Sequence, residues 1–298
     1  MYDLVIVGGG PAGLSAAVYA ARYKINFAIV APMWGGFVNE AHLVENWLGD
    51  KSITGQELSA KFIDHTKSLK PTMITANVQA IEKINDGFEV VTRDKKIQAK
   101  KIILAVGTER NKLGVKGEEE FLGKGVSYCA TCDGFFFKNK TVIVAGSGDA
   151  ACTGATFLSD VADKVYLIYR SPKLKAEPIW IDKVNAAPNI TCMPDSKLKE
   201  ITGQGRVEKI ILEDNTEIAT DGVFIEVGST PTTYITQKLG IETDEKGYIK
   251  VDVNQKTSVE GVYAAGDITT NSSKFKQIIV AAAEGAVAVY NSYIELKS

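Results

Sequence analysis

DLVIVGGGPAGLSAAVYAARY, residues 3–23, is the stretch that decides the fold class. Its β-branched apolar run is followed by a glycine cluster and then by small residues with helical spacing, which predicts a strand, a tight turn and a helix start. The glycines have the order Gly8-x-Gly10-x-x-Gly13. In such a turn the first glycine allows the bend, the second lets the backbone approach a pyrophosphate, and the third lets helix pack on strand. The phosphates of a ligand would then lie at the helix N-terminus, where free N–H groups favour negative charge.

The same pattern returns in TVIVAGSGDAACTGATFLSDVADKVYLIYR, residues 141–170. Here Gly146-x-Gly148-x-x-Ala151 follows an expected strand at 141–145, and a second β-branched strand is expected at 164–169. One such glycine pattern is weak evidence, because a simple turn can produce it. Two strand-flanked copies predict two βαβ units in an α/β chain and two dinucleotide sites.

The segments around these units are also patterned. FEVVTRDKKIQAKKIILAVGTER, residues 88–110, predicts a β-meander that returns to a buried strand ending at Gly107, and residues 220–233 repeat that ending. Near the C-terminus, residues 261–289 predict a short strand, a turn with Asp267, a polar loop and a helix that begins near Lys276. The chain is expected to cross between domains near 112–117 and 237–245, where the apolar periodicity fades.

Composition limits the classes of partner. With 298 residues, 45% of them hydrophobic and 23% charged, the chain is long enough for two domains with separate cores. The formal net charge of -2 gives no reason to expect nucleic acid or an anionic membrane as partner. The N-terminus has no basic leader, and the most apolar later stretch is interrupted by Glu284 and is too short to span a bilayer. A cytoplasmic protein with small-molecule or protein partners is therefore expected.

Two of the four cysteines lie close together in SYCATCDGFFF, residues 127–137. A zinc site at Cys129 and Cys132 would need two more ligands, and the other cysteines and both histidines lack a suitable spacing, so no metal is expected. A structural disulfide across so short a loop would restrict the unfolded chain little. Redox exchange is the favoured interpretation, because local positive potential can lower the pKa of one thiol in such a pair. Asp133 could act as general acid and base for the dithiol or could cap the following turn.

Five stretches of the sequence match the pattern of a known family: the fingerprint at Gly8–Gly13, ENWLGD at residues 45–50, SYCATCDG, the second fingerprint, and GVYAAGD followed by Lys276-Gln277. Together they resemble the low-molecular-weight thioredoxin reductases over the whole chain. The resemblance implies two Rossmann-like, three-layer ββα domains, the second inserted in the first. Residues 1–113 and 241–298 would form a discontinuous FAD-binding domain, and residues 114–240 an NAD(P)H-binding-like domain that carries the dithiol. It also implies a homodimer that reduces thioredoxin or a thioredoxin-like protein.

The resemblance also implies roles for individual residues. Cys132 would face the flavin and receive its electrons, Cys129 would attack the disulfide of the partner, and Asp133 would be catalytic. The FAD contacts would come from the glycine-rich turns, the ends of the buried strands and the C-terminal helix start: Gly8, Gly10, Pro11, Ala12, Gly13, Gly35, Gly36, Asn46, Ala105, Gly107, Gly266, Asp267, Lys276 and Gln277. The pyridine nucleotide would be contacted by Gly146, Gly148, Asp149, Ala150, Arg170 and Lys175.

The chain departs from the family pattern at four places. The second strand ends in Ala31-Pro32 without the acid that often holds an adenosine ribose, and Trp34 is either a stacking partner or core. Lys276 stands where the family has arginine, which keeps the charge but loses bidentate contact. The run YRSPKLKAE, residues 169–177, lacks the family's arginine pair, and Thr153-Gly154 replaces its paired glutamates.

These departures leave the electron donor open. The cations of the 169–177 run could meet the 2′-phosphate of NADPH or could form a solvated loop, and the missing acid argues against NADH. The expected function is an FAD-dependent thioredoxin-disulfide reductase with weakly bound NADPH as donor. The alternatives are the same chemistry with ferredoxin or a deazaflavin as donor, a small-molecule dithiol oxidase, and a flavin-binding redox sensor without turnover.

Overall fold

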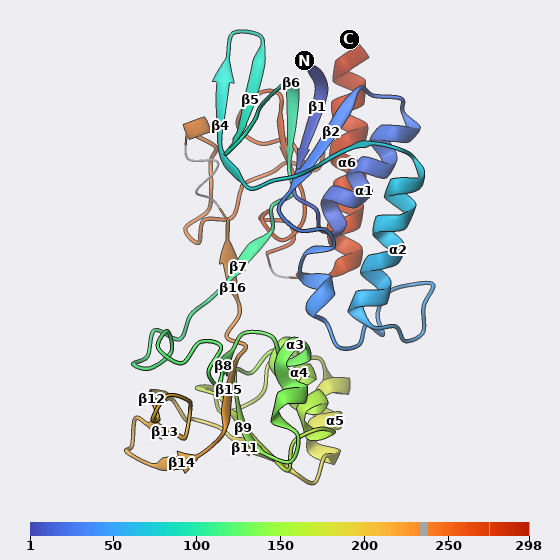
Figure 1. Ribbon diagram of the computed structural model, residues 1–298. Helices are drawn as coiled ribbons and strands as arrows, with labels where there is room; N and C mark the ends of the chain where they lie inside the picture. Colours follow the sequence, from blue (N-terminus) through green and yellow to red (C-terminus); the bar gives the residue numbers. More distant parts are fainter. Residues whose placement is uncertain (233–237, 274, 298) are drawn as a thin grey trace. The chain divides into compact units, whose positions relative to one another are not determined.

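The computed structural model describes residues 1–232, 238–273 and 275–297 (Figure 1). Contacts within the chain group the residues into two units: Met1–Asn39, Val44–Glu109 and Thr230–Ser298 form the first, and Glu40–Leu43 with Arg110–Ser229 form the second. The chain therefore passes between the units at 39–40, 43–44, 109–110 and 229–230, and the last two of these crossings lie several residues before the segments that composition indicated. Part of the later of those segments, Gln237, lies outside the described residues. The two passing strands, β7 (Thr108–Arg110) and β16 (Ser229–Pro231), pair with each other.

The first unit is built on a sheet with the strand order β3-β2-β1-β6-β5-β4, to which β17 adds by pairing with β6. Its strands are β1 (Tyr2–Val7), β2 (Phe27–Ala31), β3 (Thr72–Thr75), β4 (Val78–Ile84), β5 (Gly87–Thr92), β6 (Lys96–Leu104) and β17 (Val262–Ala264). β1 is parallel to both neighbours, with Val7 opposite Val30 and Leu104, whereas β4, β5 and β6 form an antiparallel meander. The sequences of the central strands are continuous apolar runs, because both faces of these strands are buried.

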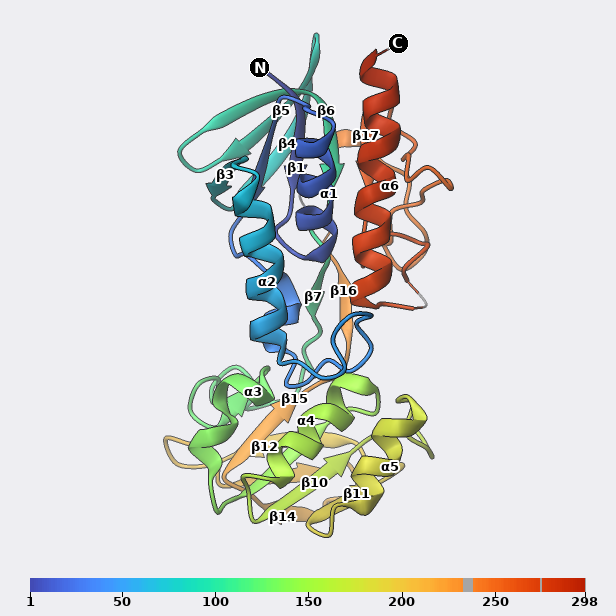
Figure 2. The same cartoon turned by 90° about the vertical axis from the view of Figure 1, so that its right-hand side faces the viewer.

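Three helices accompany this sheet: α1 (Pro11–Arg22), α2 (Gly55–Ser68) and α6 (Ile278–Lys297). Alternate residues of β1 point to opposite faces, so Leu4 and Ile6 pack with α1 and α6, while Val5 and Val7 pack with the meander. Figure 2 shows α1 and α6 side by side. The result is a layered β, β and α arrangement with one apolar core on each side of the parallel sheet.

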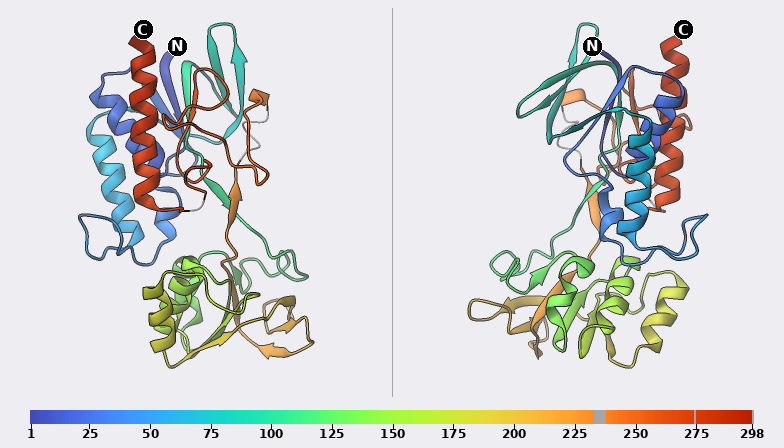
Figure 3. Two further views of the ribbon diagram at one scale, coloured as in Figure 1. Left: turned by 180° about the vertical axis from the view of Figure 1, so that it is seen from behind. Right: turned by 45° about the vertical axis from the view of Figure 1, so that its right-hand side comes forward.

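The second unit repeats this architecture. Its parallel sheet has the order β11-β10-β9-β15-β8, built from β8 (Val126–Ser127), β9 (Thr141–Ala145), β10 (Lys164–Ile168), β11 (Ile190–Met193) and β15 (Gly222–Ile225). The helices α4 (Asp149–Ser159) and α5 (Pro178–Ala186) pack on one face. The antiparallel strands β12 (Leu198–Thr202), β13 (Lys209–Leu212) and β14 (Glu217–Ala219) lie on the other (Figure 3). The prediction of two three-layer Rossmann-like folds is confirmed.

Individual elements also follow the sequence closely. The strand expected at 141–145 is β9, the strand expected at 164–169 ends one residue earlier, and the helix expected near Lys276 begins at Ile278. Short helical turns complete the chain: η1 (Gly36–Glu40), α3 (Ala130–Asp133) and η2 (Gly134–Phe137). Among the described helices none has the length and apolar content needed to cross a bilayer.

Candidate active site

The redox dithiol lies where β8 leads into α3. Cys129 and Cys132 form a disulfide with their Cα atoms 5.3 Å apart. Cys129 is the N-cap of α3, and its sulfur accepts the backbone N–H of Cys132 at 3.2 Å. Cys132 is exposed and Cys129 is half-buried. An N–H group directed at the Cys129 sulfur favours the thiolate once the bond is reduced.

Asp133 is connected to the dithiol through a residue that sequence reasoning missed. The Ser127 hydroxyl lies 2.7 Å from the Asp133 carboxylate and also accepts the backbone N–H of Cys129 at 3.0 Å. Ser127 is buried at the end of β8, so its position is fixed by the sheet. The only sequence signal was its place two residues before Cys129. The structure thus brings Cys129, Cys132 and Asp133 together, and the catalytic role of Asp133 remains a prediction.

The first fingerprint forms a glycine cradle in the first unit. Gly8 has φ of +125°, and a Cβ there would overlap the carbonyl of Ala105 at the end of β6. Gly10 is the N-cap of α1, and no side chain caps the helix. A Cβ on Gly36, whose φ is +61°, would lie 3.0 Å from the Cα of Gly10. Two glycine backbones therefore run close together beside uncapped N–H groups, which fits the pyrophosphate of FAD.

The C-terminal part of the expected flavin site also comes together. The Asn46 side chain donates to the Gln277 side chain at 3.0 Å. Burial raises the pKa of Asp267, and the charge of Lys276 acts against this shift. The Lys276 ammonium also lies 5.0 Å from the ring centre of Tyr248. The Asp267 carboxyl group and the Lys276 ammonium group, both near the start of α6, suit a polar cofactor that carries hydroxyl groups and an electron-accepting ring.

A buried carboxylate orders the loop that carries Asp267. Glu284 of α6 is 6% exposed and accepts the Gly266 N–H at 2.7 Å, the Thr269 hydroxyl at 3.0 Å and the Ser272 hydroxyl at 2.7 Å. Burial raises the pKa of Glu284, and these three donors oppose the rise. In the sequence Glu284 was visible only as the charge that interrupts an apolar helix. That interruption was the available signal for a structural acid.

The adenosine end of the expected flavin site has no acid at the end of β2, as the sequence indicated. The indole N–H of Trp34 donates to the Thr75 hydroxyl at 3.0 Å, and Trp34 packs against the core between β1 and the helices. This hydrogen bond and this packing agree with the interpretation of Trp34 as a core residue. The exposed part of its ring remains available for stacking beside the strand ends.

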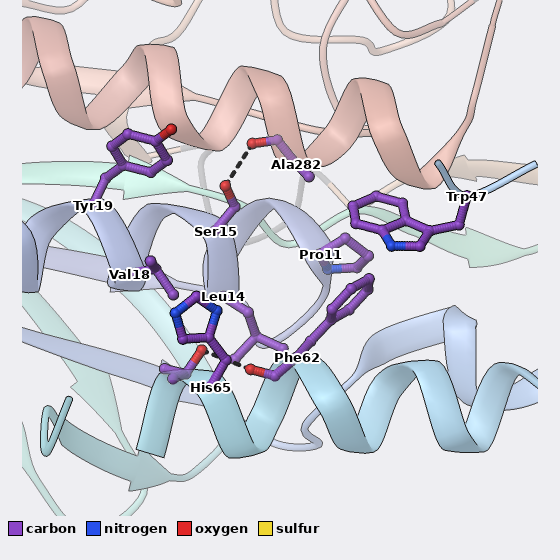
Figure 4. Close-up of a pocket in the computed structure, with 10 residues that line it drawn as sticks. Pro11, Leu14, Ser15, Val18, Tyr19, Trp47, Phe62, His65 and Ala282 are labelled. Carbon is purple, nitrogen blue, oxygen red and sulfur yellow. Dashed lines mark hydrogen bonds between the residues drawn. The ribbon is translucent and has the colours of Figure 1, made fainter. Parts of the chain in front are cut away.

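A cavity of about 200 Å³ lies beside the first turns of α1 in the same unit (Figure 4). Its wall is formed by Pro11, Leu14, Ser15, Val18, Tyr19, Trp47, Phe62, His65, Thr66 and Ala282. The Ser15 hydroxyl donates to the Ala282 carbonyl at 2.7 Å, and the Thr66 hydroxyl donates to the Phe62 carbonyl at 2.9 Å. Because the Ser15 and Thr66 hydroxyl protons are used within the protein and most of the other lining side chains are apolar, this cavity is mainly apolar and does not suit phosphates.

The second fingerprint has the same local geometry as the first. Gly146 has φ of +147°, and a Cβ there would overlap the carbonyl of Glu226, while Gly148 is an uncapped N-cap with open space around it. The segment after β10 folds back onto this turn: the Lys175 N–H donates to the Ser147 carbonyl at 2.7 Å, and the Glu177 N–H donates to the Asp149 carboxylate at 2.7 Å. Arg170, Lys173 and Lys175 are exposed. The backbone of Lys175 thus lies against the turn that precedes the uncapped helix, and the three cations of this segment are exposed to solvent.

The remaining cysteines lie in the core of the second unit. Cys152 belongs to α4 and Cys192 to β11, as expected, and burial raises the pKa of Cys152 to about 12. Cys192 is half-buried, and its sulfur accepts a hydrogen bond from the Tyr169 hydroxyl. A fully buried thiol such as Cys152 is a poor nucleophile. No group of three or more potential metal-binding side chains occurs in the part of the chain that the structure describes.

Comparison with known proteins agrees with this geometry. Residues 2–285 match the family described as pyridine nucleotide-disulphide oxidoreductase. The chain belongs to this family. The thioredoxin reductase of Bacillus subtilis is 37% identical over 307 residues, covering 99% of this chain and 95% of the relative. The crystal structure of T. acidophilum thioredoxin reductase matches with a TM-score of 0.95 at 41% identity and covers 100% of this chain and 99% of that one.

The expected relationship to the low-molecular-weight thioredoxin reductases is therefore confirmed, and the chain is an FAD-dependent oxidoreductase. A third relative is named for a different donor: the ferredoxin-flavin thioredoxin reductase of Clostridium acetobutylicum matches with a TM-score of 0.55 at 33% identity and covers 99% of this chain and 98% of that one. Family membership implies a flavin and a pyridine nucleotide donor, and the glycine cradle at Gly10 and Gly36 fits the flavin's pyrophosphate.

Proposed function

We propose that the protein reduces the disulfide of thioredoxin or a thioredoxin-like protein, taking electrons from a donor through FAD to Cys129–Cys132. The observation that carries the proposal is an exposed disulfide at the start of α3, linked through Ser127 to a carboxylate, in a chain that also has a flavin-type glycine cradle. Bound FAD would supply two-electron exchange with the dithiol. Gly8, Gly10 and Gly13 would hold its phosphates, and Asp267, Lys276 and Gln277 its polar atoms at the α6 end.

The exchange with the partner needs only the side chains of α3 and β8. The Cys129 thiolate attacks one sulfur of the partner disulfide, which forms a mixed disulfide and releases the other partner sulfur as a thiolate. Asp133, which took the proton of Cys129 when that thiol ionised, gives this proton to the released thiolate. Asp133 then takes the proton of the Cys132 thiol, and the Cys132 thiolate attacks the Cys129 sulfur. This step restores the Cys129–Cys132 disulfide and releases the second partner sulfur as a thiolate, which receives the proton from Asp133. Two electrons and two protons reach the partner, and the Ser127 hydroxyl holds Asp133 in place during both proton transfers.

An apolar docking surface follows the dithiol directly. Phe135 and Phe136 are 69% and 75% exposed, although both belong to the short turn after Asp133. Phe135 packs edge-on against Phe157 of α4, with ring centres 5.4 Å apart, so its position is defined. Exposed aromatic rings beside a reactive disulfide suit a protein substrate better than a small dithiol, because a small molecule would not cover them.

NADPH is the donor that we propose, bound by Gly146, Gly148, Asp149, Ala150, Arg170 and Lys175. The exposed cations of the segment that folds back onto the turn at Ser147 and Asp149 support a phosphate-bearing nucleotide. The second candidate is ferredoxin, which is favoured by the absence of the family's arginine pair after β10 and by the similarity to the ferredoxin-flavin thioredoxin reductase of C. acetobutylicum. Reduction of the bound flavin by NADPH, NADH and reduced ferredoxin, measured by stopped flow, separates the two donors.

A homodimer formed through the first unit is also proposed. Tyr19 of α1 and Tyr290, Ile279 and Ile294 of α6 are 39%, 51%, 43% and 48% exposed on two helices that lie side by side. Together with the apolar cavity at α1, they form an apolar surface of the kind that a second copy covers. Light scattering at several protein concentrations, with Tyr290→Glu as the disrupting variant, tests this arrangement.

We further assign residues 1–113 and 241–298 to FAD and residues 114–240 to the nucleotide and the dithiol, in a cytoplasmic protein whose thiols cycle in a reducing compartment. The activity itself is tested by steady-state reduction of thioredoxin. Cys129→Ser and Cys132→Ser should each abolish turnover while FAD content stays at the wild-type level. Cys152→Ser, which changes a buried thiol in the same unit, should keep it. Retention of most activity in Cys129→Ser would show that the exchange mechanism is wrong.

A further inference from the structure

Three charged side chains meet where the chain enters and leaves the second unit. Glu40 opens the short segment 40–43, Arg110 is the first residue of the long segment, and Glu226 lies close to its end. Arg110 forms ion pairs with both Glu226 and Glu40, and its Nε lies 3.0 Å from the Glu40 carboxylate. Nothing in the exchange mechanism requires this cluster.

The cluster contacts both residues between the two redox cysteines. The backbone N–H of Ala130, the first residue of α3, donates to the Glu226 carboxylate. The Thr131 hydroxyl donates to the backbone carbonyl of Glu40 at 2.7 Å and lies 3.4 Å from the Cys129 sulfur. The conformation of the Cys129–Cys132 loop is therefore tied to Glu226 on one side and to Glu40 on the other.

The charges of the cluster do not balance when every group is ionised. Two carboxylates share one guanidinium, and the Glu226 side chain is only 5% exposed. Burial raises the pKa of Glu226, Arg110 opposes this rise and Glu40 adds to it, so that the resulting pKa is about 7. Arg110 of β7 and Glu40 of η1 are thus the charged groups that face the Glu226 carboxylate. From α3, the Ala130 N–H faces the same carboxylate. The cluster can therefore exchange a proton near neutral pH.

We propose that Glu226, held by Arg110, is a positioning residue that fixes α3 and opposes ionisation of the Cys129 thiol. The hydrogen bond to Ala130 orders the helix whose Cys132 N–H stabilises the Cys129 sulfur. The charge of the carboxylate acts in the opposite direction, because a negative group at the start of α3 disfavours a second negative charge on Cys129. The inference rests on the proposed disulfide exchange, in which Cys129 must ionise to attack the partner.

The electrostatic effect is tested on the full-length, FAD-bound protein after reduction with dithiothreitol and its removal. Iodoacetamide modifies Cys129 at a rate that follows its thiolate fraction, and fragmentation of the peptide 125–138 in the mass spectrometer distinguishes Cys129 from Cys132, which the same peptide contains. At pH 8, Glu226→Gln should react about threefold or more faster than wild type, since one nearby charge is removed. The pH profile of the rate should lie at lower pH in Glu226→Gln than in wild type, while the other ionisable groups beside Cys129, namely Cys132 and Asp133, are the same in both proteins.

The positioning effect is tested by hydrogen exchange of the amides at 130–133. Glu226→Leu removes the acceptor, so the Ala130 amide should exchange about tenfold or more faster, whereas Glu226→Gln keeps an acceptor oxygen and should exchange as wild type does. Glu200→Gln is the matched control, because Glu200 also pairs with a cation, Lys116 at 2.7 Å, is 23% exposed and lies in β12 of the same unit. It should change neither readout.

Coincident alkylation profiles of wild type and Glu226→Gln, or equal exchange of Ala130 in wild type and Glu226→Leu, would overturn the proposal. Neither measurement uses thioredoxin or an electron donor. A protein that behaves as expected here but fails to reduce thioredoxin would contradict the proposed function alone.

Discussion

The Ser127 hydroxyl lies 2.7 Å from the Asp133 carboxylate and holds the acid beside the disulfide that precedes it. Asp133→Asn keeps the shape of the side chain but removes its ability to give and take a proton. We expect turnover with thioredoxin to fall about 100-fold, in the range for loss of one general acid-base group. Ser127→Ala should cause a smaller loss, because the acid remains but is less well oriented. Equal turnover of Asp133→Asn and wild type over the whole pH range would assign Asp133 a structural role only.

Gly10 allows a clean test of the flavin cradle. A Cβ at this position would meet only the Cα of Gly36, at 3.9 Å, so the fold itself accepts a small side chain. Gly10→Val should nevertheless abolish flavin binding, because the side chain would stand where backbone must approach phosphate. Gly148→Val is the matched control, since it makes the same change at the second fingerprint. Absorbance of the purified variants gives the FAD content. A fully yellow Gly10→Val protein would refute the assignment.

Glu284 should control the order of the Asp267 loop. Glu284→Ala leaves the Gly266 N–H and the Thr269 and Ser272 hydroxyls without their buried acceptor, and each unsatisfied group costs about 1 to 3 kcal/mol. We expect a clear loss of thermal stability and weaker retention of FAD on gel filtration. Glu284→Gln, which can still accept, should be intermediate. Unchanged FAD retention in Glu284→Ala would show that the loop does not depend on this side chain.

The nucleotide site should be weak for NADPH and weaker for NADH. Each lost charge-assisted contact costs about 1.5 to 3 kcal/mol, so two lost contacts weaken binding by about two to four powers of ten. The double variant Ser171→Arg and Lys175→Arg should tighten NADPH selectively, because NADH has no 2′-phosphate to meet the new guanidinium groups. The apparent affinities are measured by flavin reduction at one salt concentration. Equal gains for both nucleotides would mean that neither residue meets the 2′-phosphate.

Glu226 should make stability depend on pH. Its folded pKa of about 7 lies above the ordinary value of 4.5, so between these values the folded protein holds a proton that the unfolded chain releases. The free energy of unfolding should therefore fall as pH rises from about 4.5 to about 7, by up to roughly 3 kcal/mol, and should then level off. Urea unfolding of wild type and Glu226→Gln at several pH values measures the difference. If the free energy of unfolding of wild type rose relative to that of Glu226→Gln between about pH 4.5 and about pH 7, the result would contradict a buried Glu226 that holds a proton.

Structural features that depend on a local residue pattern could be predicted from the sequence. The turns at Gly8–Gly13 and Gly146–Ala151 were found because a bend, a close backbone approach and helix packing each require a small residue at a fixed spacing. Ser127, Glu284 and the Arg110–Glu226 pair were missed as functional positions. A serine in a strand has many uses, an acid in an apolar helix has no visible partner, and Arg110 and Glu226 are 116 positions apart, so only the folded chain joins them.

The positions where the chain passes between the two units show the same limit of prediction from local sequence pattern. Composition changes near 112–117, but the contacts of the chain change at Glu109–Arg110, because the short ladder of β7 and β16 continues the extended pattern of the strands before it. A pattern of residue types does not record which of two distant strands will pair. The assignment of each unit to its cofactor accordingly remains a prediction for ligand-binding experiments.

The central claim, that Cys129 passes electrons to a thioredoxin-like protein, is tested most directly by trapping the mixed disulfide. Reduced Cys132→Ser protein is mixed with oxidised thioredoxin, and the linked peptides are identified by mass spectrometry. Because this variant lacks the thiol that resolves the bond, we expect a stable one-to-one adduct joined through Cys129, and none with the double variant Cys129→Ser/Cys132→Ser. An adduct through Cys152 or Cys192, or none at all while wild-type protein reduces the same thioredoxin, would contradict the account.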